Sequence, residues 1–587
     1  MTELFAVDDV HDRRLVRSAT GLLAVFNRAG VLEAADVHVA ARLGAVVGET
    51  DDSVLLAVAL AVRAVRRGSV CVDLAEVVLA EPDLPWPAVD GWLARVEASP
   101  LTAASVTRVD AGLLYLDRYW REEGQVRDDL VARADQPAPV VDAAVLEAGA
   151  ARLFPAGYAE QRAAAQAAAT RWTTVLTGGP GTGKTTAVAG LLALLAEQAG
   201  PGRPPRVALT APTGKAAARL QEAVARATAA LPPADRARLG QLTASTLHRL
   251  LGSRPDSRTR FRHHRDNRLP HDVVVVDETS MVSLTMMARL VEAVRPDARL
   301  VLVGDPDQLA SVEAGAVLAD LVAGLGSRDA DAVAALRTSH RFGARIGALA
   351  AAVRDGDDDL AWTLLTEGGP EIELVLADDG AAELVRRVSL DAALAVRAAA
   401  ESGDGAAAIA VMERHRLLCA HREGPYGAAH WNRQVERWLG EALGTPVGLA
   451  WGREWYAGRP LLVTANDYGL GLFNGDTGVV VRDDSAPRGL RAVIAGVGSH
   501  LDFATSRLSD VETLHAMTVH KSQGSQAAEV TVLLPPEDSR LLSRELFYTA
   551  ITRAQDKVRV VGTEATVRAA VTRRAQRASG LARRLAR

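Results

Sequence analysis

Residues 178–185 have the sequence Gly-Gly-Pro-Gly-Thr-Gly-Lys-Thr, and this stretch decides the fold. It follows an apolar run at 173–177 and precedes a helix-like run at 186–196, which is the strand–loop–helix setting of a phosphate-binding loop. Glycines let backbone N–H groups surround phosphates, and the helix N-terminus adds positive potential. Lys184 should reach the β- and γ-phosphates, and Thr185 should bind Mg²⁺. The predicted nucleotide-binding residues here are Gly178, Gly179, Pro180, Gly181, Thr182, Gly183, Lys184, Thr185 and Thr186.

Polar residues that could act on a bound nucleotide follow two further predicted strands. Asp277 and Glu278 follow the four valines at 273–276, which are typical of a buried parallel strand. We expect Asp277 to bind Mg²⁺ with Thr185 and Glu278 to polarise the attacking water. Alone, an acidic pair is more often a solvated loop. The apolar run 300–303 ends in Gly-Asp-Pro-Asp-Gln-Leu, 304–309, which would place Gln308 near the γ-phosphate.

The rest of the chain from about 154 alternates strand-like and helix-like segments, which predicts an α/β fold with two parallel-sheet domains. We place these domains at 124–335 and 336–587. Residues 460–513 contain short apolar runs and an Asn-Gly-Asp turn at 474–476, which predicts a small inserted β-barrel. Residues 1–123 are mainly helical and are predicted to bind partners. Residues 124–145 could be a linker or a short helical connection.

Composition excludes several classes of protein. With 48% apolar and 24% charged residues, the 587-residue chain is typical of soluble globular proteins. Two cysteines cannot build a disulfide framework, and no apolar run reaches the roughly 20 residues of a membrane span. We therefore expect a cytoplasmic protein. A net charge of −5 excludes a basic coat for nucleic acid but allows a local basic channel. The tail from 567 has seven arginines and no acid, and could contact DNA or a partner, or be a solvated helix.

Seven segments stand in a recognisable order: 178–185, 211–219, 245–249, 277–278, 304–309, 518–524 and 548–554. The chain thereby resembles the 5′→3′ branch of superfamily-1 helicases and, within it, the RecD family, the α subunits of exodeoxyribonuclease V (RecBCD). The segments 422–427 and 455–460 also resemble this family. The resemblance is strong over about 155–587 and faint before it, where it rests on 70–72 and 114–120.

The resemblance implies two RecA-like domains with ATP in the cleft between them, termed 1A and 2A, and an SH3-like inserted barrel, 2B. Arg341, within 339–342, and Arg553 match arginines that reach the γ-phosphate from the second domain, where a guanidinium stabilises developing charge. Gln161 matches the adenine-binding glutamine of the family, although Gln166 lies nearby. Gly524 is implied to contact the nucleotide as well.

The resemblance also implies a path for single-stranded DNA across both domains. Hydroxyl groups and lysines hold phosphates without recognising bases, as a translocating enzyme requires. The matching residues are Thr213, Lys215, Ser245, Thr246 and His248 in the first domain and Thr518, His520, Lys521 and Ser522 in the second. The basic run 254–268 matches the small 1B hairpin, placed at about 252–270, that splits duplexes, although it could be a solvated loop.

One position departs from the family pattern. Gln526 stands where relatives usually have a glutamate that accepts the ribose hydroxyl, and a neutral amide accepts this bond more weakly. This substitution puts tight sugar preference in doubt but leaves hydrolysis intact.

Three functions remain open on these grounds. The favoured one is an ATP-dependent 5′→3′ DNA motor that unwinds and resects double-strand breaks with RecB-like and RecC-like subunits, acting on single-stranded and duplex-end DNA. The alternatives are a stand-alone helicase of the same family and a regulatory subunit whose ATP site only switches conformation. A nuclease within this chain is not expected, because no further cluster of acidic and lysine residues is present.

Overall fold

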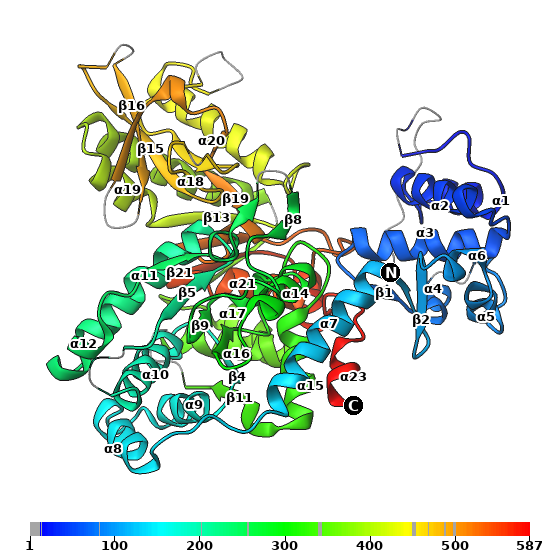
Figure 1. Ribbon diagram of the computed structural model, residues 1–587. Coiled ribbons are helices and arrows are strands. Elements are labelled where there is room, and N and C mark those ends of the chain that lie inside the picture. Colours follow the sequence, from blue (N-terminus) through cyan, green and yellow to red (C-terminus); the bar gives the residue numbers. More distant parts are fainter. Residues whose placement is uncertain are drawn as a thin grey trace.

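The computed structural model describes residues 12, 14–80, 83–200, 202, 204–254, 257–338, 343–377, 379–448, 454–467, 469–486, 489–496 and 500–587. Its elements fall into an N-terminal region, two α/β domains and an inserted sheet that projects from the second domain (Figure 1). Among the described residues, no helix combines the length and the apolar character that crossing a membrane would require.

The N-terminal region is a helical cluster with a small antiparallel sheet of strand order β1-β3-β2. Helix α3 is buried on nearly all sides, and Phe26 and Trp92 pack against it with no exposed surface. The elements are α1 (Gly21–Arg28), α2 (Ala34–Val47), α3 (Asp52–Arg66), β1 (Cys71–Val72), α4 (Leu74–Ala80), α5 (Trp92–Glu97), α6 (Pro100–Ala103), β2 (Thr107–Asp110) and β3 (Leu113–Leu116).

The first α/β domain contains a six-stranded sheet, all of whose paired strands are parallel, in the order β11-β4-β10-β9-β5-β6. Its strands are β4 (Thr173–Gly178), β5 (Val207–Ala211), β6 (Ala244–Thr246), β9 (Val273–Val276), β10 (Arg299–Gly304) and β11 (Val333–Leu336). Its helices are α8 (Ala143–Leu153), α9 (Ala159–Thr170), α10 (Lys184–Gln198), α11 (Gly214–Ala229), α12 (Pro233–Leu239), α13 (Leu247–Leu251), α14 (Leu284–Ala293) and α15 (Val317–Arg328), with short 3-10 turns η1 (Thr279–Met281) and η2 (Ala330–Ala332).

The second α/β domain has a five-stranded parallel sheet of order β12-β21-β20-β13-β19. Its strands are β12 (Ile372–Leu376), β13 (His415–Cys419), β19 (Ala516–Thr518), β20 (Ala527–Leu533) and β21 (Ala554–Gly562). Its helices are α16 (Ala344–Asp355), α17 (Asp358–Glu367), α18 (Asp379–Glu401), α19 (Gly405–Met412), α20 (Ala428–Leu443), α21 (Arg544–Ile551) and α22 (Glu564–Thr572), with the 3-10 turn η5 (His520–Ser522). The predicted α/β class with parallel sheets is therefore confirmed.

The inserted sheet is antiparallel and has the strand order β17-β16-β15-β14-β18. Its elements are β14 (Pro460–Val463), β15 (Thr477–Arg482), β16 (Leu490–Ala495), β17 (His500–Ala504), η4 (Thr505–Arg507) and β18 (Val511–Thr513). Over the residues that are described, the end strands β17 and β18 do not pair with each other. The sheet lies within the predicted 460–513 segment, but its closure into a barrel is not shown.

Helix α7 (Asp117–Ala134) runs through residue 123, at which the sequence suggested a domain boundary. Its end is fixed to the first α/β domain, because Arg133 is buried and donates hydrogen bonds to the carbonyls of Trp172, at 2.8 Å, and Arg295, at 2.7 Å. The segment 124–145 is therefore mostly a packed helix, and the connection between α7 and α8 is short.

The chain ends in a segment that returns to its beginning, residues 577–587, here called the C-terminal strap. It contains α23 (Leu581–Ala586), which lies against α7 and α15 (Figure 1). Leu581 and Leu585 are fully buried, and the Val70 N–H donates to the Ala578 carbonyl at 2.9 Å. This segment is neither a solvated helix nor a free basic tail, because its apolar side chains enter the core between the N-terminal region and α15.

Candidate nucleotide site and nucleic-acid channel

The glycine-rich loop joins β4 to α10 at the carboxyl edge of the first sheet. Gly181 and Gly183 have φ of 83° and 82°, a backbone region that side chains disfavour. The Lys184 Nζ donates to the carbonyls of Gly178, at 2.6 Å, and Gly179, at 2.9 Å. The ammonium group of Lys184 therefore contacts the backbone of the loop itself. Thr185 is half-buried in the first turn of α10. This geometry fits polyphosphate binding, because the loop supplies both backbone donors and a cation.

Asp277 and Glu278 leave the same edge of the sheet, because β9 and β4 are both parallel neighbours of β10. Burial and the neighbouring Glu278 charge raise the pKa of Asp277 to about 6, while Lys184 acts in the opposite direction. Glu278 adopts φ of 51°, which is uncommon for a residue with a side chain and typical of functional sites. Asp277 thus lies within electrostatic range of both Glu278 and Lys184.

The end of β10 connects this edge to the second domain. Asp305 is buried and accepts hydrogen bonds from Gln308 Nε2 at 2.9 Å and from the Tyr548 hydroxyl at 3.0 Å. A Cβ atom added to Gly179 would lie 2.9 Å from the same hydroxyl, so Tyr548 of α21 reaches over the glycine-rich loop. The Gln308 Oε1 is buried without a hydrogen-bond partner among the described residues, which leaves an acceptor for a bound molecule or water.

Leu309 carries two more bonds between the domains. Its N–H donates to the Thr549 hydroxyl at 2.8 Å, and its carbonyl accepts from Gln523 Nε2 at 2.6 Å. The segment 304–309 is therefore held by side chains from two parts of the second domain, α21 and the turn after η5.

Of the two arginines predicted to reach the γ-phosphate, Arg553 lies within the described residues and Arg341 does not. Arg553 is buried in the second domain and donates to the carbonyls of Thr549, at 3.0 Å, and Ser525, at 3.4 Å. Its charge and that of Glu278 both act on Arg219 of α11, whose pKa is lowered mainly by burial. Arg219, to which the sequence analysis assigned no role, therefore lies within electrostatic range of both Glu278 and Arg553. Arg341 falls outside the described residues.

The last two predicted nucleotide-binding residues, Gln161 and Gly524, contact different parts of the first domain. Gln161 is buried in α9 and donates through Nε2 to the Thr182 carbonyl at 2.8 Å, so it supports the glycine-rich loop from behind. Gly524 has φ of 67°, and an added Cβ atom would contact Ala216 of α11 at 3.5 Å. Gly524 therefore faces the first domain at the start of α11.

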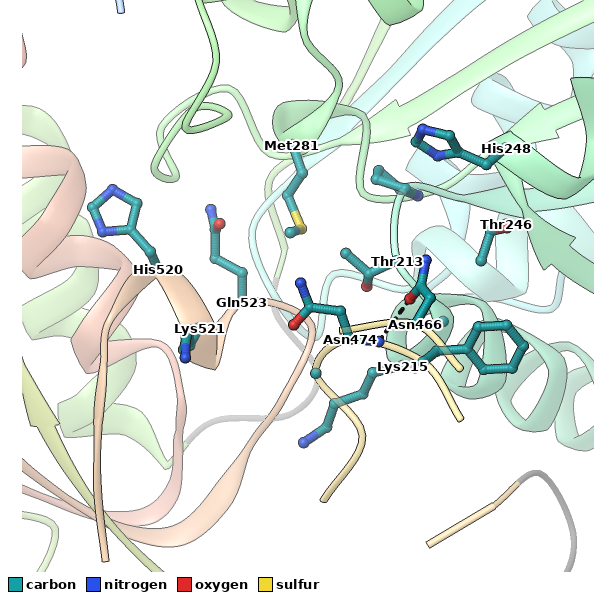
Figure 2. A pocket seen from close by; sticks show the side chains of 14 residues that line it. Thr213, Lys215, Thr246, His248, Met281, Asn466, Asn474, His520, Lys521 and Gln523 are labelled. Carbon is teal, nitrogen blue, oxygen red and sulfur yellow. Dashed lines mark hydrogen bonds between the residues drawn. The ribbon is translucent and has the colours of Figure 1, made fainter. Parts of the chain in front are cut away.

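A cavity of about 320 Å³ lies between the two α/β domains and the inserted sheet (Figure 2). Of the residues predicted to hold DNA, six line it: Thr213, Lys215, Thr246, His248, His520 and Lys521. Its other lining residues are Pro212, Gly214, Met281, Asn466, Phe473, Asn474, Gly475 and Gln523. Sequence reasoning assigned no binding role to this second group. Pro212, Gly214 and Gln523 lie within the motif segments 211–219 and 518–524, and the turn signal at 474–476 marked Asn474 and Gly475.

The hydroxyls of the first domain have a structural role at the cavity. Thr213 caps α11 by accepting from the Ala216 N–H, and Thr246 caps α13 by accepting from the Arg249 N–H, both at 3.2 Å. Both caps place helix N-termini, with their positive potential, beside the cavity. Lys215 completes this wall, and burial lowers its pKa to about 7.

On the second-domain wall, Lys521 forms an ion pair with Glu512 of β18 at 3.1 Å. Burial lowers the pKa of His520 to about 4, which keeps its ring neutral at physiological pH.

Three predicted DNA-binding residues do not line the cavity. Ser522 is buried and donates to the Val519 carbonyl at 2.7 Å, so its hydroxyl is directed into the fold. Thr518 accepts from the Lys521 N–H at 3.3 Å and supports the turn that presents Lys521. Ser245 lies on β6 outside the lining.

An antiparallel strand pair, β7 (Ser253–Arg254) and β8 (Ser257–Phe261), lies within the segment 252–270. The Phe261 ring packs edge-on against His248 at 5.8 Å between ring centres. The base of the hairpin therefore touches a residue of the cavity.

Comparison with known proteins assigns these features to a family. The model "RecBCD enzyme subunit RecD, N-terminal domain" matches residues 28–141, "AAA domain" matches 161–314, and "UvrD-like helicase C-terminal domain" matches 513–561. The RecBCD enzyme subunit RecD of Mycolicibacterium smegmatis is 64% identical over 95% of this chain and 98% of its own length. The chain belongs to the RecD family.

More distant RecD-like proteins and helicases are also similar. The RecBCD enzyme subunit RecD of Mycobacterium tuberculosis is 62% identical over 97% of both chains. The ATP-dependent RecD2 DNA helicase of Deinococcus radiodurans is 34% identical over 78% of this chain and 56% of its own length. A solved Pif1 helicase from Candida albicans is 15% identical, covers 70% of this chain and 96% of its own, and has a TM-score of 0.38.

Membership of the RecD family confirms the enzyme class that the motifs predicted, an ATP-dependent DNA helicase. It also confirms that the protein uses a nucleotide. The glycine-rich loop lies inside the matched AAA domain. In this RecD-family chain Gln526 is half-buried, and its Oε1 accepts from Gln555 Nε2 at 3.3 Å.

Proposed function

We propose that this RecD-family chain is the 5′→3′ motor subunit of a RecBCD-type helicase–nuclease that unwinds and resects double-strand breaks for recombinational repair. Its partners would be RecB-like and RecC-like subunits, and its substrates single-stranded and duplex-end DNA. One observation supports the motor proposal above all. Asp305 and Leu309 form hydrogen bonds with residues of the second domain, so the sheet edge that carries the glycine-rich loop is linked to the domain that forms the other wall of the cavity.

At the nucleotide site, Lys184 would exchange its bonds to the loop carbonyls for bonds to the β- and γ-phosphates. Glu278 would orient the attacking water, and the orphan Oε1 of Gln308 would accept a hydrogen bond from that water. Thr185 and Asp277 would hold Mg²⁺, which neutralises phosphate charge when bound. A hydroxyl and one carboxylate suit this ion, because Mg²⁺ keeps several waters and phosphate oxygens as ligands.

Closure of the cleft would complete the site from the second domain. Arg553 is held by the carbonyls of Thr549 and Ser525, and its guanidinium would stabilise charge at the γ-phosphate once the cleft has closed. Arg341 would supply the second positive charge. Gln161 and Gly524 would bind the nucleotide from the loop side and the second-domain side.

The cavity would hold the single strand. Thr213, Lys215, Ser245, Thr246 and His248 are proposed contacts of the first domain, and Thr518, His520, Lys521 and Ser522 those of the second. Because the two walls belong to different domains, opening and closing of the cleft would move one wall along the strand relative to the other. Ser522 and Thr518 would act by shaping the turn that presents Lys521.

The domain division is part of this proposal. The N-terminal partner-binding domain would span 1–123, domain 1A 124–335 with the hairpin 1B at about 252–270, and domain 2A 336–587. The inserted sheet at about 460–513 would be the SH3-like barrel 2B.

A stand-alone helicase is the second candidate, and one observation favours it: the likeness to RecD2 of Deinococcus radiodurans. That likeness spans 56% of the RecD2 protein, whereas the RecD subunit of M. smegmatis is matched over 98%. The match of 28–141 to the RecD N-terminal domain also supports the subunit. A regulatory ATP switch has no observation in its favour.

The test is strand displacement by the purified chain, alone and with RecB-like and RecC-like proteins. Forked duplexes would carry only a 5′ or only a 3′ single-stranded tail. We expect ATP-dependent unwinding from the 5′ tail, and Lys184→Ala should reduce it about 100-fold or more. Unwinding from the 3′ tail would reverse the proposed polarity. Failure to co-purify with two larger subunits would favour the stand-alone helicase.

A further inference from the structure

One residue that lines the cavity belongs to the same short segment as the acidic pair. Met281 is the last residue of the 3-10 turn η1, which begins directly after Glu278. Its side chain lines the cavity, and Figure 2 shows its thioether directed toward the space between Gln523 of the second domain and Thr213 of the first. The segment 278–281 therefore has one end at the nucleotide edge and the other in the cavity.

A backbone hydrogen bond joins the two ends of this segment. The Met281 N–H donates to the Glu278 carbonyl at 3.0 Å. Asp277, by contrast, is held by the sheet, because its N–H donates to the Thr210 carbonyl of β5 at 2.8 Å. A displacement of Met281 would therefore move Glu278 and leave Asp277 in place.

Two features indicate that the turn can adopt a second arrangement. Glu278 has φ of 51°, which is sterically disfavoured for a residue with a side chain. Ser280 is 6% exposed, and its hydroxyl has no hydrogen-bond partner among the described residues. A buried hydroxyl without a partner is costly, so a shift of the turn that gave it one would be favourable. Strain of this kind is common in segments that switch between conformations.

The chemistry of Met281 differs from that of the residues predicted to hold phosphates. Lys215 and Lys521 bring cationic side chains to the cavity, whereas Met281 is half-buried and ends in an uncharged, flexible thioether. An apolar side chain packs against sugars and base faces, and such contacts tolerate any base sequence. Met281 can therefore respond to the presence of a strand without selecting its sequence.

We propose that Met281 is a positioning residue, which the strand in the cavity displaces and which thereby orients Glu278. With a strand bound, the turn shifts and the Glu278 carboxylate aligns the attacking water with the γ-phosphate. This inference rests on the proposed function, because it takes the cavity to be the DNA channel and Glu278 to orient the water. Fast hydrolysis is then restricted to protein that holds a strand.

The ATPase activity of the full chain, measured across a range of oligothymidylate concentrations, tests this role. Met281→Ala should lower kcat at saturating oligothymidylate about tenfold, because Glu278 is no longer aligned. The oligothymidylate concentration that gives half of the stimulation should change by less than about twofold, since the lysines still hold the phosphates. Met281→Leu, with a side chain of similar volume, should retain most of the wild-type kcat. Weaker oligothymidylate binding with an unchanged kcat would overturn the proposal, because Met281 would then be only a binding contact.

A double variant tests whether Met281 acts through Glu278. Single-turnover hydrolysis with saturating oligothymidylate would be measured for Glu278→Gln with and without Met281→Ala. The second substitution should cause little further loss, because residues that act as a unit are not additive. A further loss of about tenfold in the Glu278→Gln background would overturn the proposal, since Met281 would then act independently of Glu278.

Met286→Ala is the matched control. Met286 is also half-buried, but it lies on α14 and packs against the core of the first domain. Its stimulation should match that of the wild type, and an equal loss in the two alanine variants would overturn the role of Met281. The wild type separates the two levels of inference. If oligothymidylate does not stimulate it, the proposed function fails; if it does and Met281→Ala is stimulated equally, only the role of Met281 fails.

Discussion

Among single residues, Tyr548 connects the two α/β domains through a direct hydrogen bond. Its hydroxyl belongs to α21 of the second domain, yet it donates to Asp305 and overhangs Gly179 of the glycine-rich loop. A hydrogen bond to a buried carboxylate is worth about 1.5–3 kcal/mol. Loss of this hydrogen bond should therefore weaken the association of the two domains.

We expect Tyr548→Phe to uncouple ATP hydrolysis from unwinding. The variant should hydrolyse ATP with little change in KM but unwind about tenfold fewer base pairs per ATP, because about 1.4 kcal/mol of interdomain bonding is lost. Parallel ATPase and strand-displacement assays measure this ratio. Tyr456→Phe is the matched control, because Tyr456 is another buried tyrosine of the second domain, bonded to Glu436 and His515. Equal loss in both variants would indicate general destabilisation.

The stability of the C-terminal strap should depend on pH because of Asp320. Burial raises the pKa of this α15 carboxyl to about 7, helped by Glu123, while Ser579 acts in the opposite direction. A folded-state pKa above the ordinary 3.8 favours the folded state at low pH, and this contribution is lost as the pH rises through 7.

Asp320→Asn should therefore stabilise the strap by about 2 kcal/mol above pH 7. The gain should shrink as the pH falls and vanish near pH 4. Hydrogen exchange of the α23 amides at several pH values reports this opening free energy. A gain that is independent of pH would show that Asp320 does not titrate as described.

Among the elements, the C-terminal strap is packed too closely to tolerate a larger residue at one position. Gly580 lies against the N-terminal region, and an added Cβ atom would be 2.0 Å from the Tyr115 hydroxyl and 3.4 Å from the ring carbon that bears it. The same segment is held by Glu123, which accepts from Ser579 and from the Gly580 N–H.

We expect Gly580→Ala to destabilise the protein by about 1–3 kcal/mol, as overpacking does. Adding Tyr115→Phe removes the nearest atom and should restore part of this loss. Thermal unfolding of the wild type, the two single variants and the double variant measures the coupling. Simple additivity would contradict the predicted contact.

For the whole molecule, the strap decides how firmly the N-terminal region is joined to the first α/β domain. Arg584 is mostly buried and pairs with Asp110 of β2 and Glu123 of α7, at 2.8 and 3.3 Å, above the rings of Tyr115 and Trp120. Helix α7 is the other connection, fixed at its end by Arg133.

A chain shortened by residues 577–587 should expose α7 and α15 to protease and lose hydrogen-exchange protection in β1 and β3. The sheet of the second α/β domain should keep its protection, because its core is separate from the strap. The first sheet should lose part of its protection, because Leu581 and Leu585 share one hydrophobic core with Val274 and Leu300. Arg583→Ala provides a mild control, since Arg583 is exposed on the same helix. Loss of protection in the second sheet would instead show that the strap stabilises the whole molecule.

The sequence predicted those parts of the site that follow from chain-local rules. A glycine-rich loop after an apolar run, and acids after four valines, lie at one sheet edge because parallel strands all end there. The contact between Phe473 and Gly214 could not be predicted in this way, because the two residues are far apart in the sequence and belong to different parts of the fold. Ser522 and Thr518 match the family pattern, but a motif does not tell which way a hydroxyl points. The strap was missed because its arginines suggested solvent, whereas Leu581 and Leu585 decide its packing.

The return of the last residues to the first has a consequence for how this protein is made. A ribosome adds about 5–20 residues per second, so the strap follows β1 by roughly 25–100 s. During that interval the N-terminal region can fold its own helices, but the surface of α7 and β3 that α23 later covers remains bare. Folding of this region can therefore finish only after the strap has been synthesised.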